Sequence, residues 1–212
     1  MLEIWWIRHG TTDWNTVKRW QGHTDLPLNE NGRQLARLLA PRLEGIPFDE
    51  CWSSDLQRSA ETARLALPGR EIKLDDRLRE LHMGALEGKT WNEISQELQQ
   101  EVSNWWKDPY NRPFPGGPES LRDVSNRVKA WQSERPKEGR IIVFTHGGVI
   151  RCCLWDIFGM PTPEHNWTIE LDNTGIVRIR YAESCATLVC FNDVSHIKNS
   201  WNLPPAQSLP SG

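Results

Sequence analysis

The first apolar stretch of the chain, residues 2–7, constrains the fold more than any other segment. The stretch is continuous rather than alternating, which is typical of a strand buried on both faces in a parallel sheet. Arg8, His9 and Gly10 follow it directly. This change from apolar to polar residues predicts a strand that opens into a loop at the carboxyl edge of a sheet, where ligands of such sheets bind.

A second strand is expected at residues 140–145, because residues 141–145 are all β-branched or aromatic. His146, Gly147 and Gly148 come next, before a segment of helical character over 149–158. A second group of polar and small residues therefore also stands at the carboxyl end of a predicted strand.

The remaining pattern alternates between the two kinds of element, with Asn29 as the N-cap of the first long helix. Further helices are expected at 30–43, 56–67, 91–99 and 118–133, and further strands at 48–53, 72–74, 168–171, 175–181 and 186–191. Such alternation predicts an α/β fold in which helices cover both faces of a mostly parallel sheet.

The length of 212 residues is enough for one well-buried core and short for two. We therefore expect a single domain over 1–193. After Asp193 the hydrophobicity falls and Pro204, Pro205 and Pro210 appear, so 194–212 is predicted to be a loosely held tail.

Charge and hydropathy argue against several classes of partner. The formal net charge is -3 and no basic run is present, which disfavours a nucleic-acid partner. Arg151 and Asp156 interrupt the apolar region after Val149, so no membrane span is expected. The first residues show neither a basic lead nor a small-residue cleavage site, and we expect a cytoplasmic protein.

Cysteine and histidine spacing disfavours disulfides and metal binding. The five cysteines are an odd number without the spacing of a disulfide framework, and we interpret them as reduced packing residues. Metal binding is an alternative interpretation of His9, His82, His146 and Glu80, yet no Cys-x-x-Cys pattern, no His-Glu-x-x-His pattern and no acidic cluster is present. No metal and no cofactor are therefore expected.

Four separated motifs occur in a fixed order. They are Arg8-His9-Gly10-Thr11-Thr12 with Asn15, Ser53-Ser54-Asp55-Leu56 leading to Arg58, Leu78-Arg79-Glu80-Leu81 with Glu87-Gly88, and His146-Gly147-Gly148. Taken singly, each of these residues has an ordinary structural explanation. Together the motifs resemble the histidine phosphatase superfamily, which also contains the cofactor-dependent phosphoglycerate mutases. The resemblance extends to about residue 193. It implies a phosphoglycerate mutase-like three-layer α/β/α sandwich with a small helical cap near the active site.

The resemblance also implies a role for each motif residue. His9 is expected to be the nucleophile, since a neutral imidazole can attack phosphorus and the phosphohistidine can be discharged by water. Glu80 is expected to protonate the leaving oxygen and then to activate water. The expected phosphate-binding residues, chosen for their charge or donor groups, are Arg8, Asn15, Arg58, His146 and Gly147. His146 is counted among the catalytic residues as well.

The sequence favours the phosphatase branch of the family, whose members include α-ribazole and broad-specificity phosphatases. The run from His146 to Arg151 resembles that branch, whereas mutases usually carry Asn and Ser after the first Gly. The expected activity is metal-independent hydrolysis of a small-molecule phosphate ester by a histidine acid-type phosphatase. A phosphoglycerate mutase and a catalytically silent phospho-ligand binder are the alternatives. A homodimer is compatible with the sequence.

Two features leave the substrate open. The tryptophans in polar segments could form an aromatic wall for a ring-bearing phosphate or could pack a helical cap, and they are Trp14, Trp20, Trp91, Trp105 and Trp106. The stretch 113–120, PFPGGPES, resembles a family segment that contacts phosphate, but Pro118 interrupts it. We therefore interpret Glu119 and Ser120 as a helix start.

Overall fold

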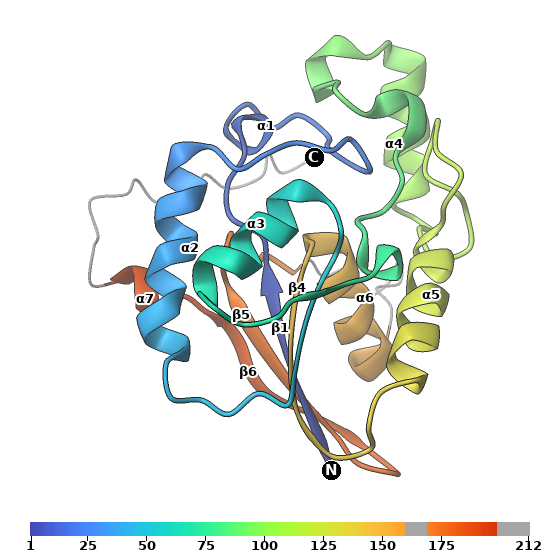
Figure 1. Cartoon of the computed structure of the whole chain (residues 1–212). Coiled ribbons are helices and arrows are strands. Elements are labelled where there is room, and N and C mark those ends of the chain that lie inside the picture. The colour runs from blue at the N-terminus through green and yellow to red at the C-terminus, as the bar shows by residue number, and fades with distance from the viewer. Residues whose placement is uncertain (160–168, 199–212) are drawn as a thin grey trace.

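A six-stranded sheet forms the centre of the computed structural model, which describes residues 1–159 and 169–198 (Figure 1). The strand order is β3-β2-β4-β1-β5-β6. The bounds are β1 Leu2–Arg8, β2 Glu50–Ser53, β3 Lys73–Leu74, β4 Gly139–Thr145, β5 Ile176–Tyr181 and β6 Ala186–Asp193. β3, β2, β4 and β1 pair in parallel, whereas β5 runs antiparallel to both β1 and β6. The mostly parallel α/β sheet expected from the sequence is confirmed.

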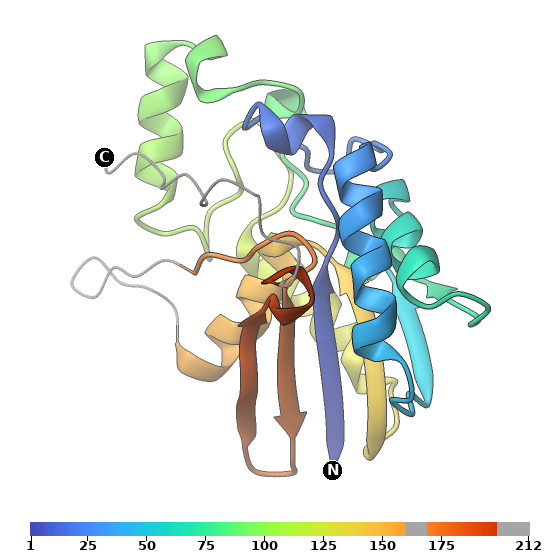
Figure 2. The same cartoon turned by 90° about the vertical axis from the view of Figure 1, so that its left-hand side faces the viewer.

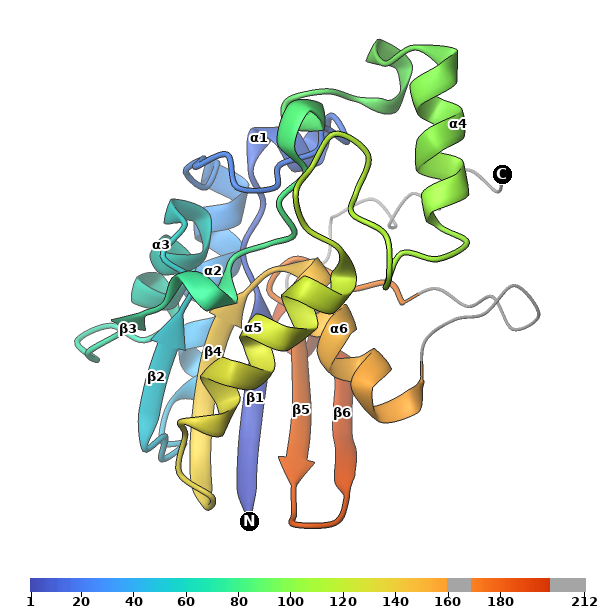
Figure 3. The ribbon, with the colours of Figure 1, turned by 90° about the vertical axis from the view of Figure 1, so that its right-hand side faces the viewer.

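The helices lie on both faces of this sheet. Their bounds are α1 Asp13–Thr16, α2 Glu30–Leu43, α3 Gln57–Ala66, α4 Gln96–Trp105, α5 Leu121–Ser133, α6 Gly147–Phe158 and α7 Ser195–Lys198. α2 and α3 cover one face, as Figure 2 shows from that side, and α5 and α6 cover the other (Figure 3). The three layers of the expected sandwich are therefore present.

β1 supplies side chains to both halves of the core. Ile4 and Trp6 belong to the apolar cluster on the α5 and α6 side, whereas Trp5 and Ile7 belong to the cluster on the α2 and α3 side. All four side chains are buried. The continuous apolar run therefore has the explanation that the sequence suggested, because each face of the strand meets a layer of helices.

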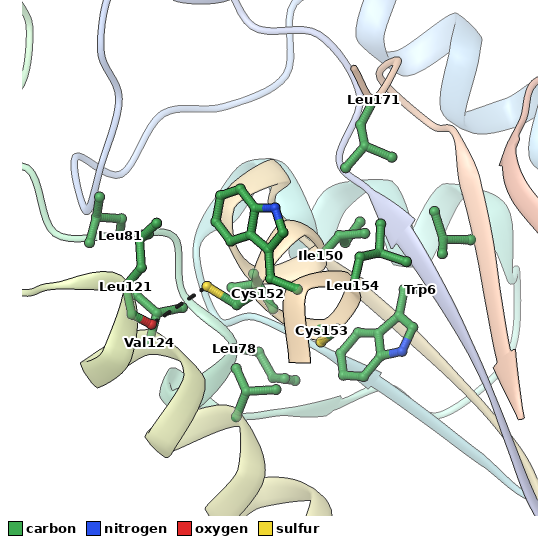
Figure 4. Packing of buried hydrophobic residues seen from close by; sticks show 14 of the residues in the cluster. Trp6, Leu78, Leu81, Leu121, Val124, Ile150, Cys152, Cys153, Leu154 and Leu171 are labelled. Carbon is green, nitrogen blue, oxygen red and sulfur yellow. Dashed lines mark hydrogen bonds between the residues drawn. The ribbon is translucent and has the colours of Figure 1, made fainter. Parts of the chain in front are cut away.

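α5 and α6 are packed against each other as well as against the sheet. In Figure 4, Cys152 of α6 points toward α5, and its Sγ donates a weak hydrogen bond to Leu121 O at 3.6 Å. Cys153 faces the neighbourhood of Trp6 and Leu154. Burial raises the pKa of both thiols. These two cysteines are packing residues, as expected. This packing holds the start of α6 firmly at the sheet edge.

The helical cap differs in detail from the sequence prediction. A helix over 91–99 was expected, but Trp91–Glu93 is a single 3-10 turn and the helix α4 starts at Gln96. The reason is local, since Ser95 accepts from Leu98 N and acts as the N-cap. Similarly, α5 begins at Leu121 rather than at residue 118, because Ser120 caps it in a reciprocal pair with Asp123.

The strand expected at 168–171 is wrong for the part that the structure describes. Residues 169–171 lie outside any strand, and residue 168 is outside the described residues. Their carbonyl groups have other partners, because Arg151 Nε donates to Ile169 O at 3.0 Å and Arg8 donates to Leu171 O. Arginine side chains thus take the place of a neighbouring strand.

The start of the expected tail is helical. α7 packs near α2, where Ile197 is buried, and His196 Nε2 lies 2.9 Å from Thr174 Oγ1. Residues 199–212 lie outside the described residues. Among the helices that the structure describes, none is long and apolar enough to cross a membrane.

Candidate active site

Parallel pairing of β1 and β4 brings the two histidine motifs together. Arg8, the last residue of β1, is opposite Thr145, the last residue of β4. His9 N then donates to Thr145 O at 2.9 Å. The ring centroids of His9 and His146 are 5.1 Å apart. Residues separated by more than 130 positions therefore face one another at the carboxyl edge of the sheet, as the sequence predicts.

The His9 ring is held by a main-chain oxygen. Its Nδ1 lies 2.6 Å from Gly10 O, and the side chain of Asn173 donates to the same oxygen and to His9 O. A carbonyl can only accept, so Nδ1 carries the proton and Nε2 keeps its lone pair. Burial lowers the pKa of His9 well below its ordinary value, and the Arg58 and Arg8 guanidiniums lower it further. The imidazole is thus neutral and has a free nitrogen.

His146 is oriented by a hydroxyl group. Its Nε2 lies 2.9 Å from Ser54 Oγ, and its buried Nδ1 has no hydrogen-bond partner in the described part of the chain. Burial, followed by Arg58 and His9, lowers the pKa of His146, so the ring is neutral. Ser54 Oγ already accepts from Leu56 N at 3.3 Å, so its own proton is available to His146 Nε2, which places the ring proton on Nδ1. His146 is therefore ready to donate to a ligand.

Arg58 is fully buried in the first turn of α3. Its Nη1 donates to Thr24 O at 2.9 Å and its Nη2 to Gly22 O at 2.8 Å. Burial lowers its pKa to about 10, which leaves the guanidinium charged at neutral pH. A solvated arginine at a helix start is therefore not what the structure contains.

Arg8 and Gly147 complete the cationic side of the site. The Arg8 side chain is half-buried with its Nε enclosed, and burial together with the nearby Arg151 lowers its pKa to about 10. A Cβ placed on Gly147 would lie 3.7 Å from Arg8 Nε. Gly147 is the first residue of α6, with His146 as the N-cap, so its amide adds partial positive charge beside the guanidinium.

Three of the nine buried side-chain polar atoms for which the described residues give no hydrogen-bond partner belong to this group. Arg8 Nε, Arg58 Nε and His146 Nδ1 all lack a hydrogen-bond partner among the described residues. Buried donors are almost always paired, because leaving one unpaired costs roughly 1–3 kcal/mol. Three unpaired donors on neighbouring residues, two of them cationic, indicate a site for an anion.

Glu80 lies at the start of α6 although it comes from the loop between two 3-10 turns. Its Oε1 accepts from Leu81 N at 2.9 Å and its Oε2 from Gly148 N at 3.1 Å. A Cβ on Gly148 would collide with this carboxyl group, so the contact requires glycine. Glu80 is thereby tied to the helix that bears Gly147.

The main chain of Glu80 is held from two further elements. Its carbonyl oxygen accepts from His23 Nε2 at 2.8 Å and from Arg127 Nη2 at 2.9 Å. Arg127 is held in turn by Glu119, whose Oε1 is 2.9 Å from Arg127 Nε. Glu119, which comes just before the N-cap of α5, therefore holds Arg127 in place in addition to its favourable position near the helix dipole.

Asn15 has a local role in the structure. Its Oδ1 accepts from Thr12 N at 3.0 Å, and Thr12 caps the short helix α1 in return. The donor group Nδ2 is the part of the side chain available to a ligand. The phosphate contact expected for Asn15 stays a prediction.

Four residues that position the site were not assigned such a role from the sequence. They are Ser54, Asn173, His23 and Arg127. Ser54 lies inside one of the quoted motifs, so its position was visible but its partner was not. Asn173 and Arg127 carry no motif signal, because their role depends only on the approach of distant segments.

The tryptophans divide into two groups. Trp20, Trp105 and Trp106 line a cleft that also includes Glu80 and Gly148. Trp91 packs edge-on against Trp20, with centroids 6.4 Å apart, and Trp14 lies against Gly88. Trp20 thus belongs both to the cleft wall and to the packing of Trp91, whereas Trp14 packs near Gly88.

No group of three or more metal-binding side chains is found in residues 1–159 and 169–198.

Known proteins resemble this chain in sequence and in fold. Residues 4–194 match the family model described as histidine phosphatase superfamily (branch 1). A Salmonella choleraesuis protein named "Probable phosphoglycerate mutase GpmB" is 34% identical over 192 residues, which cover 87% of each chain.

Two solved structures give the same picture. A phosphoserine phosphatase mutant from Entamoeba histolytica, in complex with phosphoserine, has a TM-score of 0.79 at 27% identity and covers 93% of this chain and 100% of that one. The α-ribazole phosphatase from Shigella flexneri has a TM-score of 0.77 at 28% identity, covering 90% and 96%. The resemblance drawn from the motifs is confirmed.

Proposed function

The chain belongs to the histidine phosphatase superfamily, branch 1, and we propose that it hydrolyses small-molecule phosphate monoesters through a phosphohistidine at residue 9 without a metal ion. The observation that carries this proposal is the set of three unpaired buried donors on Arg8, Arg58 and His146 beside a neutral imidazole. They are suited to the equatorial oxygens of a phosphoryl group, whose charge they compensate during transfer.

In the first step, His9 Nε2 attacks phosphorus and the bond from phosphorus to the ester oxygen breaks. Glu80 gives its proton to the departing oxygen, which leaves as an alcohol. The His9 ring keeps its proton on Nδ1, which donates it in a hydrogen bond to Gly10 O. The phosphorylated ring is therefore a cation, and this main-chain acceptor stabilises it. Arg58 and Arg8 hold the transferred group throughout.

In the second step, the Glu80 carboxylate removes a proton from water, and the resulting hydroxyl attacks phosphorus. The bond between Nε2 and phosphorus breaks, and inorganic phosphate leaves with His9 neutral again. The two steps use one carboxyl group first as acid and then as base. Its two hydrogen bonds from Leu81 N and Gly148 N keep it in one place for both.

A mutase is the second candidate, favoured by the relative named for phosphoglycerate mutase activity. A mutase must return the phosphoryl group to substrate, so it has to exclude water from the phosphohistidine. Three proteins among the structural neighbours are named as a phosphoserine phosphatase, a glucosyl-3-phosphoglycerate phosphatase and an α-ribazole phosphatase, which supports hydrolysis as the primary reaction. A cytoplasmic location is part of the proposal.

The test is a phosphoenzyme trap combined with turnover. We expect p-nitrophenyl phosphate to be hydrolysed in the presence of EDTA, and a rapid alkaline quench followed by mass spectrometry to find phosphate on His9. His9→Asn should abolish both signals. His82→Asn serves as the matched histidine control and should retain the phosphoenzyme.

The result also separates the alternatives. Phosphoenzyme that persists until a phosphoglycerate acceptor is added would indicate a mutase, and binding without any phosphoenzyme would indicate a silent binder. Activity that EDTA removes and a divalent cation restores would contradict metal independence.

A further inference from the structure

The cleft beside Glu80 is the place that a leaving group must enter. Glu80 and Gly148 line it, and the proposed reaction requires the ester oxygen to reach the Glu80 carboxyl group. The rest of the ester therefore extends into this cleft. Its chemistry constrains the class of alcohol or phenol that the enzyme releases.

Most of the wall is apolar, and five of its eleven residues carry aromatic rings. The rings belong to Trp20, Trp105, Trp106, Phe114 and Trp155. Trp105 contacts Phe114 edge-on with centroids 5.0 Å apart, and Trp20 contacts the same ring at 6.2 Å. Trp106, by contrast, is 59% exposed at the mouth of the cleft. A polyhydroxylated alcohol would leave hydroxyl groups unpaired against these rings, whereas an apolar or aromatic body would bury area and stack.

One cation interrupts the aromatic wall. Arg151 stands on α6 one turn after Gly147 and lines the same cleft. Its Nε donates to Ile169 O at 3.0 Å, which leaves the two Nη groups to face other partners. A Cβ on Gly147 would lie 3.4 Å from Arg151 Nη1 and 3.7 Å from Arg8 Nε, so Arg151 stands where the phosphate pocket meets the cleft.

Arg151 forms no salt bridge within 4.0 Å with a carboxylate of the described residues, and the carboxylates whose fields reach it are Glu80 and Glu170. Burial lowers its pKa, and the field of Glu80 opposes that effect. The Arg151 side chain is half-buried, and a guanidinium without an ion pair can take an anionic partner from a ligand. The Nη fork suits a carboxylate or a similar planar acid.

We propose that the physiological leaving group is an aromatic or apolar body bearing an anionic substituent near the ester oxygen, and that Arg151 binds this substituent while the tryptophans hold the body. The proposal rests on the phosphatase function proposed above. It adds a second anion site next to the phosphate pocket, with Arg151 as the residue that sets specificity.

The test uses matched substrate pairs that differ only in charge. The 2-, 3- and 4-carboxyphenyl phosphates are compared with the corresponding carboxamides, which keep the ring and the shape of the substituent. For at least one isomer we expect kcat/KM to be about 10-fold higher for the carboxylate, the size expected of one charge-assisted hydrogen-bonded pair. This ratio should approach one in Arg151→Gln and recover in part in Arg151→Lys.

A second comparison addresses the aromatic wall. Cyclohexyl phosphate and glycerol 2-phosphate are both esters of secondary alcohols, so their ratio of kcat/KM reports mainly on apolar contact. Trp106→Ser, chosen because the exposed Trp106 side chain is dispensable for the core, should lower this ratio several-fold.

The outcomes distinguish this inference from the one on which it rests. If kcat/KM for the carboxylate is no higher than for the carboxamide with any isomer in the wild-type enzyme, the inference is wrong. It is also wrong if Arg151→Gln slows both members of a pair equally, because Arg151 would then be a phosphate ligand. If p-nitrophenyl phosphate is not hydrolysed at all, the phosphatase function itself fails.

Discussion

The two ends of the candidate site are built in different ways. At the phosphate end, the side chains of His9, Arg58 and His146 are almost completely buried, and main-chain carbonyls or a hydroxyl group hold each of them. At the cleft end, rings contact other rings edge-on, and Trp91 and Trp106 are 43% and 59% exposed. The first region stands on the sheet, whereas the second projects above it (Figure 3).

This difference separates chemistry from selectivity. Directional hydrogen bonds hold the donor groups of the phosphate end in defined positions, and transfer of a charged group requires such precise placement. Apolar ring contacts are less directional, so the cleft can accept changes in shape without disturbing the phosphate pocket. Substitutions at the phosphate end should therefore affect every substrate, and those at the cleft end should affect some substrates more than others.

The largest effect is expected where the two ends meet. Glu80→Gln removes the proton that an alkoxide needs in order to leave, so kcat/KM for an alkyl phosphate should fall by about 10²–10⁴-fold. The fall should be smaller for p-nitrophenyl phosphate, whose leaving group needs little protonation. Steady-state kinetics on both esters measure this, with Glu93→Gln at the surface as the control. Equal losses on the two esters would remove Glu80 from the acid role.

Within the phosphate end, Arg58→Lys should lower kcat/KM for all esters by about 10²–10³-fold, a typical cost of losing one oriented donor. Lysine lacks the fork that donates to Gly22 O and Thr24 O, and it also lacks the Nε that has no partner among the described residues. The matched control is Arg79→Lys in the partly exposed pair with Asp55, which should stay within about twofold. A loss confined to substrates with large leaving groups would contradict the division between the two ends.

A smaller effect is expected at Arg127, which touches Glu80 only through its main-chain oxygen. Arg127→Gln should lower kcat/KM for alkyl phosphates by about 10-fold through misplacement of the carboxyl group, and less for p-nitrophenyl phosphate. Because Glu119 holds Arg127, the double variant with Glu119→Gln should cost less than the sum of the single costs. Additive effects, or an effect independent of the leaving group, would show that Arg127 acts only on folding.

The smallest effect concerns stability and pH. Because the pKa values of His9 and His146 are lowered in the folded protein, the unfolded chain binds more protons once the pH falls below the ordinary histidine value. The free energy of unfolding should therefore be steady above about pH 6.5 and fall below it, by up to about 1.4 kcal/mol per pH unit for each histidine.

Urea unfolding at about pH 7.5 and about pH 5.5 measures this decline. His9→Asn should make it shallower, because asparagine takes up no proton. A decline of the same steepness in the variant would show that His9 does not contribute.

Much of the framework could be predicted from the sequence because it depends on local pattern. The apolar run of β1, the β-branched run of β4 and the Asn29 cap each specify an element from within a few residues. Since parallel strands share an edge, the convergence of His9 and His146 followed as well. The sequence pattern places the start of this helix at Trp91, whereas α4 begins at Gln96 because Ser95 acts as its N-cap.

What the amino-acid sequence determined alone is therefore the fold and the residue types at the sheet edge, since both follow from periodicity and from motifs. Only the tertiary structure decided which partner each functional group has. Ser54 meets His146 across 92 positions, and Arg127 reaches the Glu80 carbonyl across 47. A hydrogen bond or an ion pair depends on the distance through space between two groups, and that distance exists only after the layers have packed.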